Sequence, residues 1–415
     1  MKPFEVDSLR AQFPALSLDI NGRPAVYFDN PGGTQVPQRV IDAVSRYYRE
    51  QNCNVGGAFE TSRRTDDVVW SARTAMANLL NAPDPLNIVF GPNMTTLTFH
   101  LARAFGKTIR RGDEIVVTSL DHDANVSPWT DMEALGAVIR VVDFNVEDCT
   151  INRESFRNAL SERTRLVAIT HASNAVGTIP NVAELIQWAH EEGALVCVDA
   201  VQYAPHGPID VQKLDCDFLT CSAYKFFGPH VGILYGKAEH LERFKPHKVR
   251  PSKNTPPHCW ETGTLNHEGL AGVAAAVDYL SDIGRDADDE GDEKLILKRT
   301  MTRITEYEKS LSERLMDGLG SISDIKLYGI ADKQRLSERL PTFAFTWPRL
   351  TPRETAELLG REGIFTWNGN YYALRLMERL GLEAEGGAVR IGPTHYNTIE
   401  EIDRLIEVLE KVPRK

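Results

Sequence analysis

Short apolar runs alternate with amphipathic helical patterns through the middle of the chain, from about residue 87 to residue 237. Most intervals between the runs carry a helical pattern, as in 181–193. Strands that alternate with helices typically build a parallel sheet covered on both faces. We therefore predict an α/β fold with a mostly parallel central sheet. Its expected strands are 87–91, 114–120, 138–144, 165–172, 194–200, 217–223 and 231–236.

The pattern changes after residue 264, where a helical stretch leads into the acidic segment 285–294. We predict a solvated loop or linker there, because clustered like charges repel one another. A long helical pattern over 295–319 follows, and then shorter strands such as 342–347 alternate with helices. The expected organisation is an N-terminal segment (1–25) that packs on the small domain, a large ligand-binding domain (26–284) and a smaller C-terminal α+β domain (285–415).

Composition narrows the classes of partner. The chain has 415 residues, 42% of them hydrophobic and 25% charged, with a net charge of -11. The negative charge argues against a nucleic-acid partner. No apolar stretch reaches membrane-spanning length, and the N-terminus lacks a signal-peptide core, so we expect a cytoplasmic protein without a membrane partner. The six cysteines form no CxxC, which argues against a zinc or other metal site.

Two charged residues end neighbouring apolar runs. Asp199 closes the run 194–198 and Lys225 follows the run 218–223, so both are expected at the carboxyl edge of the sheet, where such folds bind ligands. A lysine can form a Schiff base with the aldehyde of pyridoxal 5'-phosphate. An aspartate can keep the pyridine nitrogen protonated. Taken singly, each residue is more typical of a solvated lysine or a turn aspartate, and only the pair indicates this cofactor.

Hydroxyl groups suited to a phosphate occur in two places. Thr95 and Thr96 follow a strand, a Gly-Pro turn and Asn93, which can cap the next helix. A helix N-terminus offers free N–H groups to an anion, although an ordinary helix cap would look the same. Ser222, three residues before Lys225, could add another hydroxyl.

Three further residues follow or occupy expected strands. His122 lies just beyond one strand and could stack on a pyridine ring, and Asn174 could contact the phenolic oxygen of the cofactor or the substrate. Arg390 is a candidate for binding a substrate carboxylate, because its planar fork matches that group bidentately. A surface or capping histidine, a turn asparagine and a surface arginine are the alternatives.

With these elements in order, the chain resembles the class V aminotransferase group of pyridoxal-phosphate enzymes, specifically its cysteine desulfurase-like branch. The resemblance extends from YFDNPGGTQVP (27–37) to RIGPTHYNTIEEIDRL (390–405), and VDAVQYAPH, SAYKFFGPHVGILYG and WETGTLN carry it most specifically. It implies a fold-type-I transferase, an amino-acid substrate and a homodimer with composite sites. The implied roles are the Schiff base and proton transfer for Lys225, the pyridine nitrogen for Asp199, the phenolic oxygen for Gln202, phosphate for Thr95, Thr96 and Ser222, ring stacking for His122, the substrate carboxylate for Arg390, and the neighbouring subunit's phosphate for Thr264.

The chain differs from that branch at the positions on which the reaction of the branch depends. Relatives carry a loop cysteine that becomes a persulfide, whereas Tyr372 stands at the matching place in NGNYYAL (368–374). VGGAF (55–59) replaces a basic HRG-like segment, and Tyr224 replaces a histidine before the lysine. We expect the stretch 366–376 to be mobile or to cover the entrance of the site.

A phenol cannot form a persulfide, so we predict a lyase that breaks the C–S bond of cysteine or of a larger thio-amino acid by β-elimination. Cys53 or Cys259 could instead replace the loop thiol. A class V aminotransferase, an amino-acid epimerase and a non-catalytic scaffold or regulator of the same fold are the other hypotheses. The sequence identifies no sulfur-acceptor protein.

Overall fold

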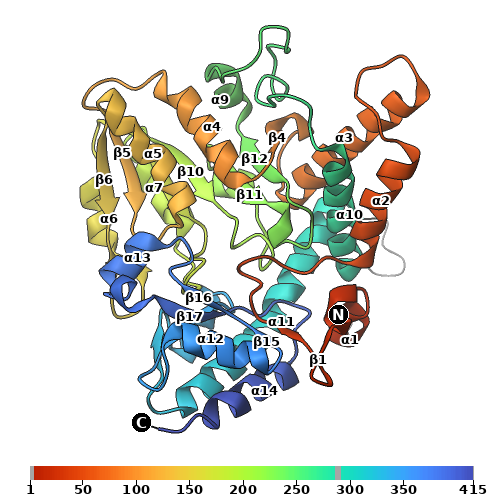
Figure 1. The fold of residues 1–415 in the computed structure, drawn as a ribbon. Helices are drawn as coiled ribbons and strands as arrows, with labels where there is room; N and C mark the ends of the chain where they lie inside the picture. The colour runs from red at the N-terminus through yellow and green to blue at the C-terminus, as the bar shows by residue number, and fades with distance from the viewer. Residues whose placement is uncertain (1–3, 286–290, 415) are drawn as a thin grey trace.

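The computed structural model describes residues 4–285 and 291–414 and has a seven-stranded sheet at its centre (Figure 1). β12 runs antiparallel to both of its neighbours, and the other six strands are parallel to one another. The predicted α/β fold with a mostly parallel sheet is therefore confirmed. In spatial order the strands are β4 (Ile88–Gly91), β12 (Gly232–Gly236), β11 (Phe218–Ser222), β10 (Leu195–Asp199), β9 (Thr164–Thr170), β5 (Glu114–Thr118) and β6 (Val138–Val142).

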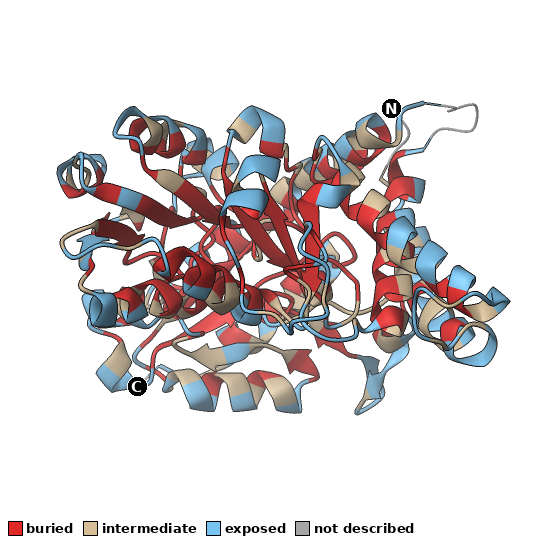
Figure 2. Ribbon diagram, turned by 90° about the horizontal axis from the view of Figure 1, so that it is seen from above, coloured by how far each residue is buried: buried red, intermediate tan, exposed pale blue. Residues whose placement is uncertain are grey.

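Both faces of the central strands are buried, because successive side chains point to opposite sides of a strand. In β10, Val196 and Val198 join one apolar core and Cys197 joins the other. Figure 2 shows this sheet as a buried layer between helices. The first core includes residues of α3 (Glu60–Leu79), α7 (Val182–Glu191) and α10 (His267–Gly284), and the second includes residues of α4 (Met94–Gly106), α5 (Ser127–Thr130) and α9 (Ala238–Arg243).

The C-terminal part forms a second, antiparallel sheet with its own core. Its order is β13 (Lys326–Tyr328), β14 (Phe343–Thr346), β17 (Ala388–Ile391) and β16 (Trp367–Gly369). Apolar residues of this sheet pack with residues of α11 (Glu293–Ser321), α12 (Pro352–Arg361) and α14 (Ile399–Glu410). Figure 1 places this small domain beside the carboxyl ends of the large sheet, with the 29-residue α11 running between the two parts.

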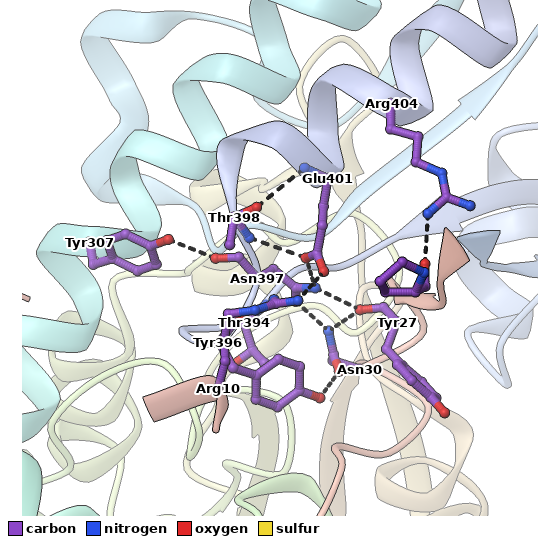
Figure 3. Close-up of polar contacts among 11 residues, drawn as sticks. Arg10, Tyr27, Asn30, Tyr307, Thr394, Tyr396, Asn397, Thr398, Glu401 and Arg404 are labelled. Carbon is purple, nitrogen blue, oxygen red and sulfur yellow. Dashed lines mark hydrogen bonds and ion pairs between the residues drawn. The ribbon is translucent and has the colours of Figure 1, made fainter. Parts of the chain in front are cut away.

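The first residues of the chain tie both parts together. β3 (Val26–Tyr27) pairs in parallel with β15 (Ile364–Phe365) of the small domain. Beyond it, the Asn30 amide donates to the carbonyl of Gly392 at 2.7 Å, and the phenol of Tyr396 donates to the Asn30 amide oxygen. Figure 3 shows this network, in which Asn397 and Glu401 join the same cluster.

α1 (Val6–Arg10) contributes to the same network. Its Arg10 forms an ion pair of 2.7 Å with Glu401 of α14 (Figure 3). Phe13, a little further along, packs its ring against Phe227 and Tyr279 of the large domain. The N-terminal residues therefore contact both domains.

One expectation needs adjustment. Part of the acidic segment 285–294, namely 286–290, lies outside the described residues, and the helix α11 already begins at Glu293. The predicted loop was thus too long, because the Asp292 side chain caps the helix by accepting from the Lys294 amide at 3.0 Å. Over residues 4–285 and 291–414, the structure has no helix long and apolar enough to cross a membrane.

Candidate active site

A cavity of about 730 Å³ opens where the carboxyl ends of the large sheet meet the small domain. The end of each of five parallel strands in the large sheet supplies or precedes residues of its wall. The small domain supplies β16, β17 and the segment after β16. Of the residues predicted from the sequence, the cavity brings together Thr95, His122, Asn174, Asp199, Gln202, Ser222, Lys225 and Arg390.

Lys225 lies in the short turn that follows β11 and is 9% exposed. Its amine donates to the carbonyl of Pro31 and, at 3.1 Å, to the carbonyl of Gly32. Burial, together with the nearby Arg390 charge, lowers the pKa of Lys225 to about 7. A large share of this amine is therefore neutral near pH 7, which is the state that attacks an aldehyde.

Asp199 ends β10 beside Lys225 and is 4% exposed. Its carboxylate accepts the Val201 amide at 2.9 Å. Burial raises the pKa of Asp199 to about 6, although this hydrogen bond and the Lys225 charge act in the opposite direction. A buried carboxylate of this kind is suited to a cationic partner, such as a protonated ring nitrogen.

The candidate phosphate end lies at the N-terminus of α4. The Asn93 side chain caps this helix by accepting the Thr96 amide at 2.8 Å, and the Met94 amide donates to the Ser222 hydroxyl at 3.0 Å. Thr95 lines the cavity, whereas Thr96 does not line it and donates its hydroxyl to Asn93 at 3.0 Å. A β-carbon on Gly232 would lie 2.3 Å from the Asn93 carbonyl carbon, so only glycine lets β12 pass this close to the helix start.

His122 follows β5 and forms part of the cavity wall. Its Nδ1 accepts the Ala124 amide at 3.0 Å, which fixes the ring orientation. Burial and the Lys225 charge lower the pKa of His122 to about 4, so the imidazole is neutral at pH 7. The Tyr372 ring stacks on it with centroids 5.5 Å apart and planes inclined by 26°.

Arg390 projects from β17 and is 4% exposed. Its guanidinium donates to the Asn174 carbonyl and to the Asp29 carboxylate, both at 3.1 Å, and lies 4.4 Å from the ring centroid of Tyr371. The Asn174 amide in turn donates to the Tyr371 carbonyl at 2.8 Å. These contacts hold the guanidinium at the cavity wall, in a position to bind a carboxylate.

The segment after β16 covers part of the cavity. Tyr371 is 6% exposed and donates its phenol to the Ala388 carbonyl, whereas Tyr372 is 71% exposed. The Tyr372 carbonyl accepts the Asp123 amide at 2.7 Å. Both tyrosines have left-handed φ angles, 55° and 57°. Of the two expectations for 366–376, the structure therefore shows the segment lying over the cavity.

Sequence reasoning missed several wall residues. Asp29 was missed, although it comes from the motif 27–37, because nothing in its local pattern shows that it meets Arg390 from the other end of the chain. Phe99 was also missed, because an aromatic residue within a helical pattern is ordinarily assigned to the core. Trp367 and Tyr371 line the cavity as well, and both belong to the stretch 366–376 for which a cover over the entrance was one expectation.

Thr264, Cys53 and Cys259 do not line the cavity. Thr264 is exposed on the loop before α10, and this loop is anchored at Glu261 by a buried ion pair of 2.6 Å with Arg73. Cys259 is 5% exposed within the second core of the large sheet, and burial raises the pKa of its thiol. The setting of Cys259 is therefore that of an inert core thiol rather than a reactive one.

The cavity fits pyridoxal 5'-phosphate on its own geometry. The buried side-chain atoms Gln202 Oε1, Asn174 Oδ1 and Arg390 Nε have no hydrogen-bond partner among the described residues. Such groups are costly when left unpaired and indicate a missing ligand. A neutral amine, a buried carboxylate, a helix N-terminus and a neutral imidazole surround the same space. These groups would serve the aldehyde, the ring nitrogen, the phosphate and the ring face respectively.

Known proteins resemble this chain along its whole length. The family model described as aminotransferase class-V matches residues 26–405. A probable cysteine desulfurase of Synechocystis sp. is 35% identical over 422 residues, covering 98% of this chain and 95% of the relative. A cysteine desulfurase of Escherichia coli K12 is 34% identical over 427 residues, covering 99% of each protein.

Solved structures show the same similarity. The apo structure of a cysteine desulfurase from Thermococcus onnurineus NA1 has a TM-score of 0.86 at 27% identity, covering 98% of this chain and 97% of that one. The structure of the cysteine desulfurase CsdA from Escherichia coli has a TM-score of 0.82 at 28% identity, covering 99% of each chain.

Proposed function

The chain belongs to the aminotransferase class-V family, as a cysteine desulfurase-like enzyme, and we propose that it cleaves the C–S bond of cysteine or of a larger thio-amino acid by β-elimination. The observation that carries this proposal is the side chain facing His122 at the cavity mouth, which is the phenol of Tyr372. In the proposal Tyr372 takes the place of a sulfur-accepting loop cysteine. A phenol cannot take up sulfur, so the sulfur must leave with the product.

Family membership implies pyridoxal 5'-phosphate as the cofactor. When bound, it supplies an electron sink for the carbanion formed at the substrate Cα. Lys225 would hold its aldehyde, Asp199 its ring nitrogen, and Gln202 its phenolic oxygen. The start of α4, with Thr95 and Ser222, would bind the phosphate. His122 would lie against the ring face, and because the imidazole is neutral it adds no charge there.

The substrate would be oriented by Arg390 and Asn174. The Arg390 guanidinium binds the α-carboxylate, since its fork matches that group. Its hydrogen bonds to Asn174 and Asp29 keep it in place before the substrate arrives, which lowers the entropy cost of positioning. The amine of Lys225, whose pKa is lowered to about 7, then removes the proton from Cα as a general base.

The elimination step balances without an added oxidant or reductant. Lys225 takes the Cα proton, the Cβ–S bond breaks, and its electron pair leaves with the sulfur. Protonation of the sulfur gives a thiol, or hydrogen sulfide from cysteine. The remaining 2-aminoacrylate reacts with one water to give pyruvate and ammonium.

We also propose that the enzyme acts as a homodimer. Thr264 is exposed on the anchored loop before α10 and does not line the cavity of its own chain. In a dimer it would complete the phosphate end of the neighbouring site. Size-exclusion chromatography with light scattering should give twice the chain mass, and Thr264→Ala should weaken cofactor binding without changing that mass.

The test of the reaction is to incubate the cofactor-loaded protein with L-cysteine and to quantify sulfide, pyruvate and alanine together. Sulfide with an equal amount of pyruvate supports β-elimination. Sulfide with alanine would contradict it and would mean desulfuration through another thiol. Nitrogen transfer to a keto acid would instead indicate an aminotransferase, and exchange of the α-hydrogen without product an epimerase. A protein that takes up no cofactor would be a scaffold.

A further inference from the structure

Three aromatic residues from separate elements line the cavity, and two of them are exposed. Phe99 comes from α4, Trp367 from β16, and Tyr372 from the segment after β16. Trp367 is 56% exposed and Tyr372 is 71% exposed, although such large apolar surfaces are usually buried. Exposed apolar surface gathered at the opening of a cavity is typical of a ligand-binding site.

We propose that the cavity takes L-cysteine derivatives that carry an uncharged, apolar substituent on sulfur, and that Phe99, Trp367 and Tyr372 bind this substituent. This inference rests on the proposed function, because it names the substrate class of the same site. The cofactor and the α-carboxylate would use the groups near Lys225 and Arg390. The aromatic residues would then be available to bind the substituent on the sulfur atom of the substrate.

The size of the cavity agrees with a substituted substrate. At about 730 Å³ it lies in the range of roughly 300–1,000 Å³ that holds drug-sized ligands. Free L-cysteine ends at its sulfur and offers no further group to the aromatic residues. An S-alkyl or S-aryl substituent would cover them, and burial of its apolar surface would strengthen binding.

The charges at the mouth disfavour an anionic substituent. Asp123 lines the cavity next to Tyr372 and accepts the Ser127 hydroxyl at 2.6 Å. The two cationic side chains among the described lining residues, Lys225 and Arg390, already have carbonyl or carboxylate partners in the deeper part. A second carboxylate at the outer end of a substrate would face Asp123, because the nearby Arg103 guanidinium, 5.7 Å from the ring centroid of Phe99, does not line the cavity.

The backbone of Tyr372 and of its neighbour Tyr371 is held in place before a substrate binds. Asp123 and Asn174 donate to the carbonyls of Tyr372 and Tyr371, at 2.7 and 2.8 Å, and so fix the segment on both sides. Left-handed backbone is strained at two successive non-glycine residues, and these bonds help to hold it. A preset binding surface selects substituents by shape with little ordering cost.

The reaction gives each substrate a defined product. Loss of the Cα proton to Lys225 and breakage of the Cβ–S bond release the substituent as its thiol, with the electron pair on sulfur. Water converts the remaining 2-aminoacrylate to pyruvate and ammonium. S-benzyl-L-cysteine would therefore yield benzyl thiol, pyruvate and ammonium in equal amounts.

The test compares four substrates on the cofactor-loaded enzyme: L-cysteine, S-ethyl-L-cysteine, S-benzyl-L-cysteine and the anionic S-carboxymethyl-L-cysteine. We expect kcat/KM for S-benzyl-L-cysteine to exceed that for L-cysteine by about tenfold or more. The anionic substrate should fall below its ethyl counterpart, and Asp123→Asn should narrow that gap. A kcat/KM for L-cysteine equal to or above that for S-benzyl-L-cysteine would overturn the inference.

Single substitutions test which side chains cause the preference for the benzyl substrate. Trp367→Ala and Tyr372→Ala should each reduce the benzyl-to-cysteine ratio several-fold. Trp70→Ala serves as the matched control, because Trp70 is similarly exposed, at 53%, but lies on α3 away from the cavity. An unchanged ratio in both cavity variants would contradict the proposed role of the aromatic residues.

A binding measurement separates the two proposals. Dissociation constants for S-benzyl-L-cysteine and L-cysteine, measured by calorimetry on cofactor-loaded Lys225→Ala protein, do not depend on turnover. Tighter binding of the benzyl compound without cleavage of any substrate by the wild-type enzyme would support the aromatic site and refute the lyase. Cleavage of L-cysteine to sulfide and pyruvate without any benzyl preference would support the lyase and refute the aromatic site.

Discussion

The two sides of the cavity are built in different ways. On the large-domain side, Asp199, Ser222 and Lys225 end buried strands or follow them directly, and none is more than 9% exposed. On the small-domain side, Trp367 and Tyr372 are more than half exposed on a short strand and a turn. The groups assigned to the cofactor thus depend on the packing of the whole sheet, whereas Trp367 and Tyr372, which are assigned to the substituent of the substrate, lie on local structure that can vary independently.

The largest effect is expected when the amine on the large-domain side is removed. Lys225→Ala should lower kcat by about 10³-fold or more, since general-base catalysis alone contributes 10²–10⁴-fold and the covalent link is lost as well. Pyruvate release measures the effect. Lys213→Ala, which removes an exposed lysine on α8 (Val211–Leu214), is the control and should leave the rate unchanged. Full turnover by Lys225→Ala would refute the assignment.

Arg390 lies on the small-domain side but is buried. Its replacement therefore tests whether the size of the loss in activity depends on the burial of a residue or on the domain that carries it. Arg390→Lys keeps the charge and loses the fork, so we expect KM to rise about 10–100-fold, as for the loss of a charged hydrogen bond of about 1.5–3 kcal/mol. Arg140→Lys is the matched control, because Arg140 is also an ion-paired strand arginine and lies outside the cavity. A KM unchanged by Arg390→Lys would mean that the substrate carboxylate binds elsewhere.

The pH dependence of cofactor uptake measures how the charge of Arg390, on the small-domain side, acts on the amine of Lys225, on the large-domain side. The pKa of Lys225 is lowered from its usual value to about 7, so the neutral, reactive amine increases as pH rises through 7. The rate at which cofactor-free protein takes up pyridoxal 5'-phosphate should therefore rise with a midpoint near pH 7.

Arg390→Gln removes a positive charge that helps to lower the pKa of Lys225, so the midpoint should move to higher pH. Absorbance of the Schiff base followed over time at each pH measures the rate. A midpoint near the ordinary lysine pKa in the wild-type protein would show that burial does not act on this amine as described.

The smallest effect concerns stability within the segment that covers the cavity. Tyr371 and Tyr372 share a left-handed backbone but differ in exposure, 6% against 71%. Tyr371→Gly should lower the free energy of unfolding by about 2–3 kcal/mol, because the loss of a buried ring outweighs the relief of strain. Tyr372→Gly should change it by no more than about 1 kcal/mol, since little packing is lost. Urea denaturation followed by circular dichroism distinguishes the two, and equal losses would contradict the assignment.

The strand-side residues were open to prediction because their signal is local. Asp199 and Lys225 each follow a continuous apolar run, and parallel strands bring their carboxyl ends to one edge. Thr96 shows the limit of this reasoning, because neighbouring positions in a first helical turn point in different directions. Only Thr95 reaches the cavity, while the Thr96 hydroxyl bonds to Asn93.

The other residues depend on contacts across the chain that no local pattern reveals. Asp29 and Arg390 are separated by 361 positions, and His206 pairs with Glu308 of α11 at 2.7 Å across 102 positions. The predicted α/β class is confirmed, and so is the family. The antiparallel direction of β12 was not foreseen, because an apolar run has the same pattern in either direction.

The pairing of β3 with β15, and of Asp29 with Arg390, has a consequence for the newly made chain. The amine of Lys225 binds the carbonyls of Pro31 and Gly32. The preceding residue, Asn30, is itself held by Gly392 and by Asn397, and Figure 3 shows the contact with Asn397. Nearly the entire polypeptide must therefore be synthesised before Lys225 acquires its final surroundings. Products terminated before Arg390 would lack part of the site, so partial synthesis should yield inactive protein rather than an enzyme of altered specificity.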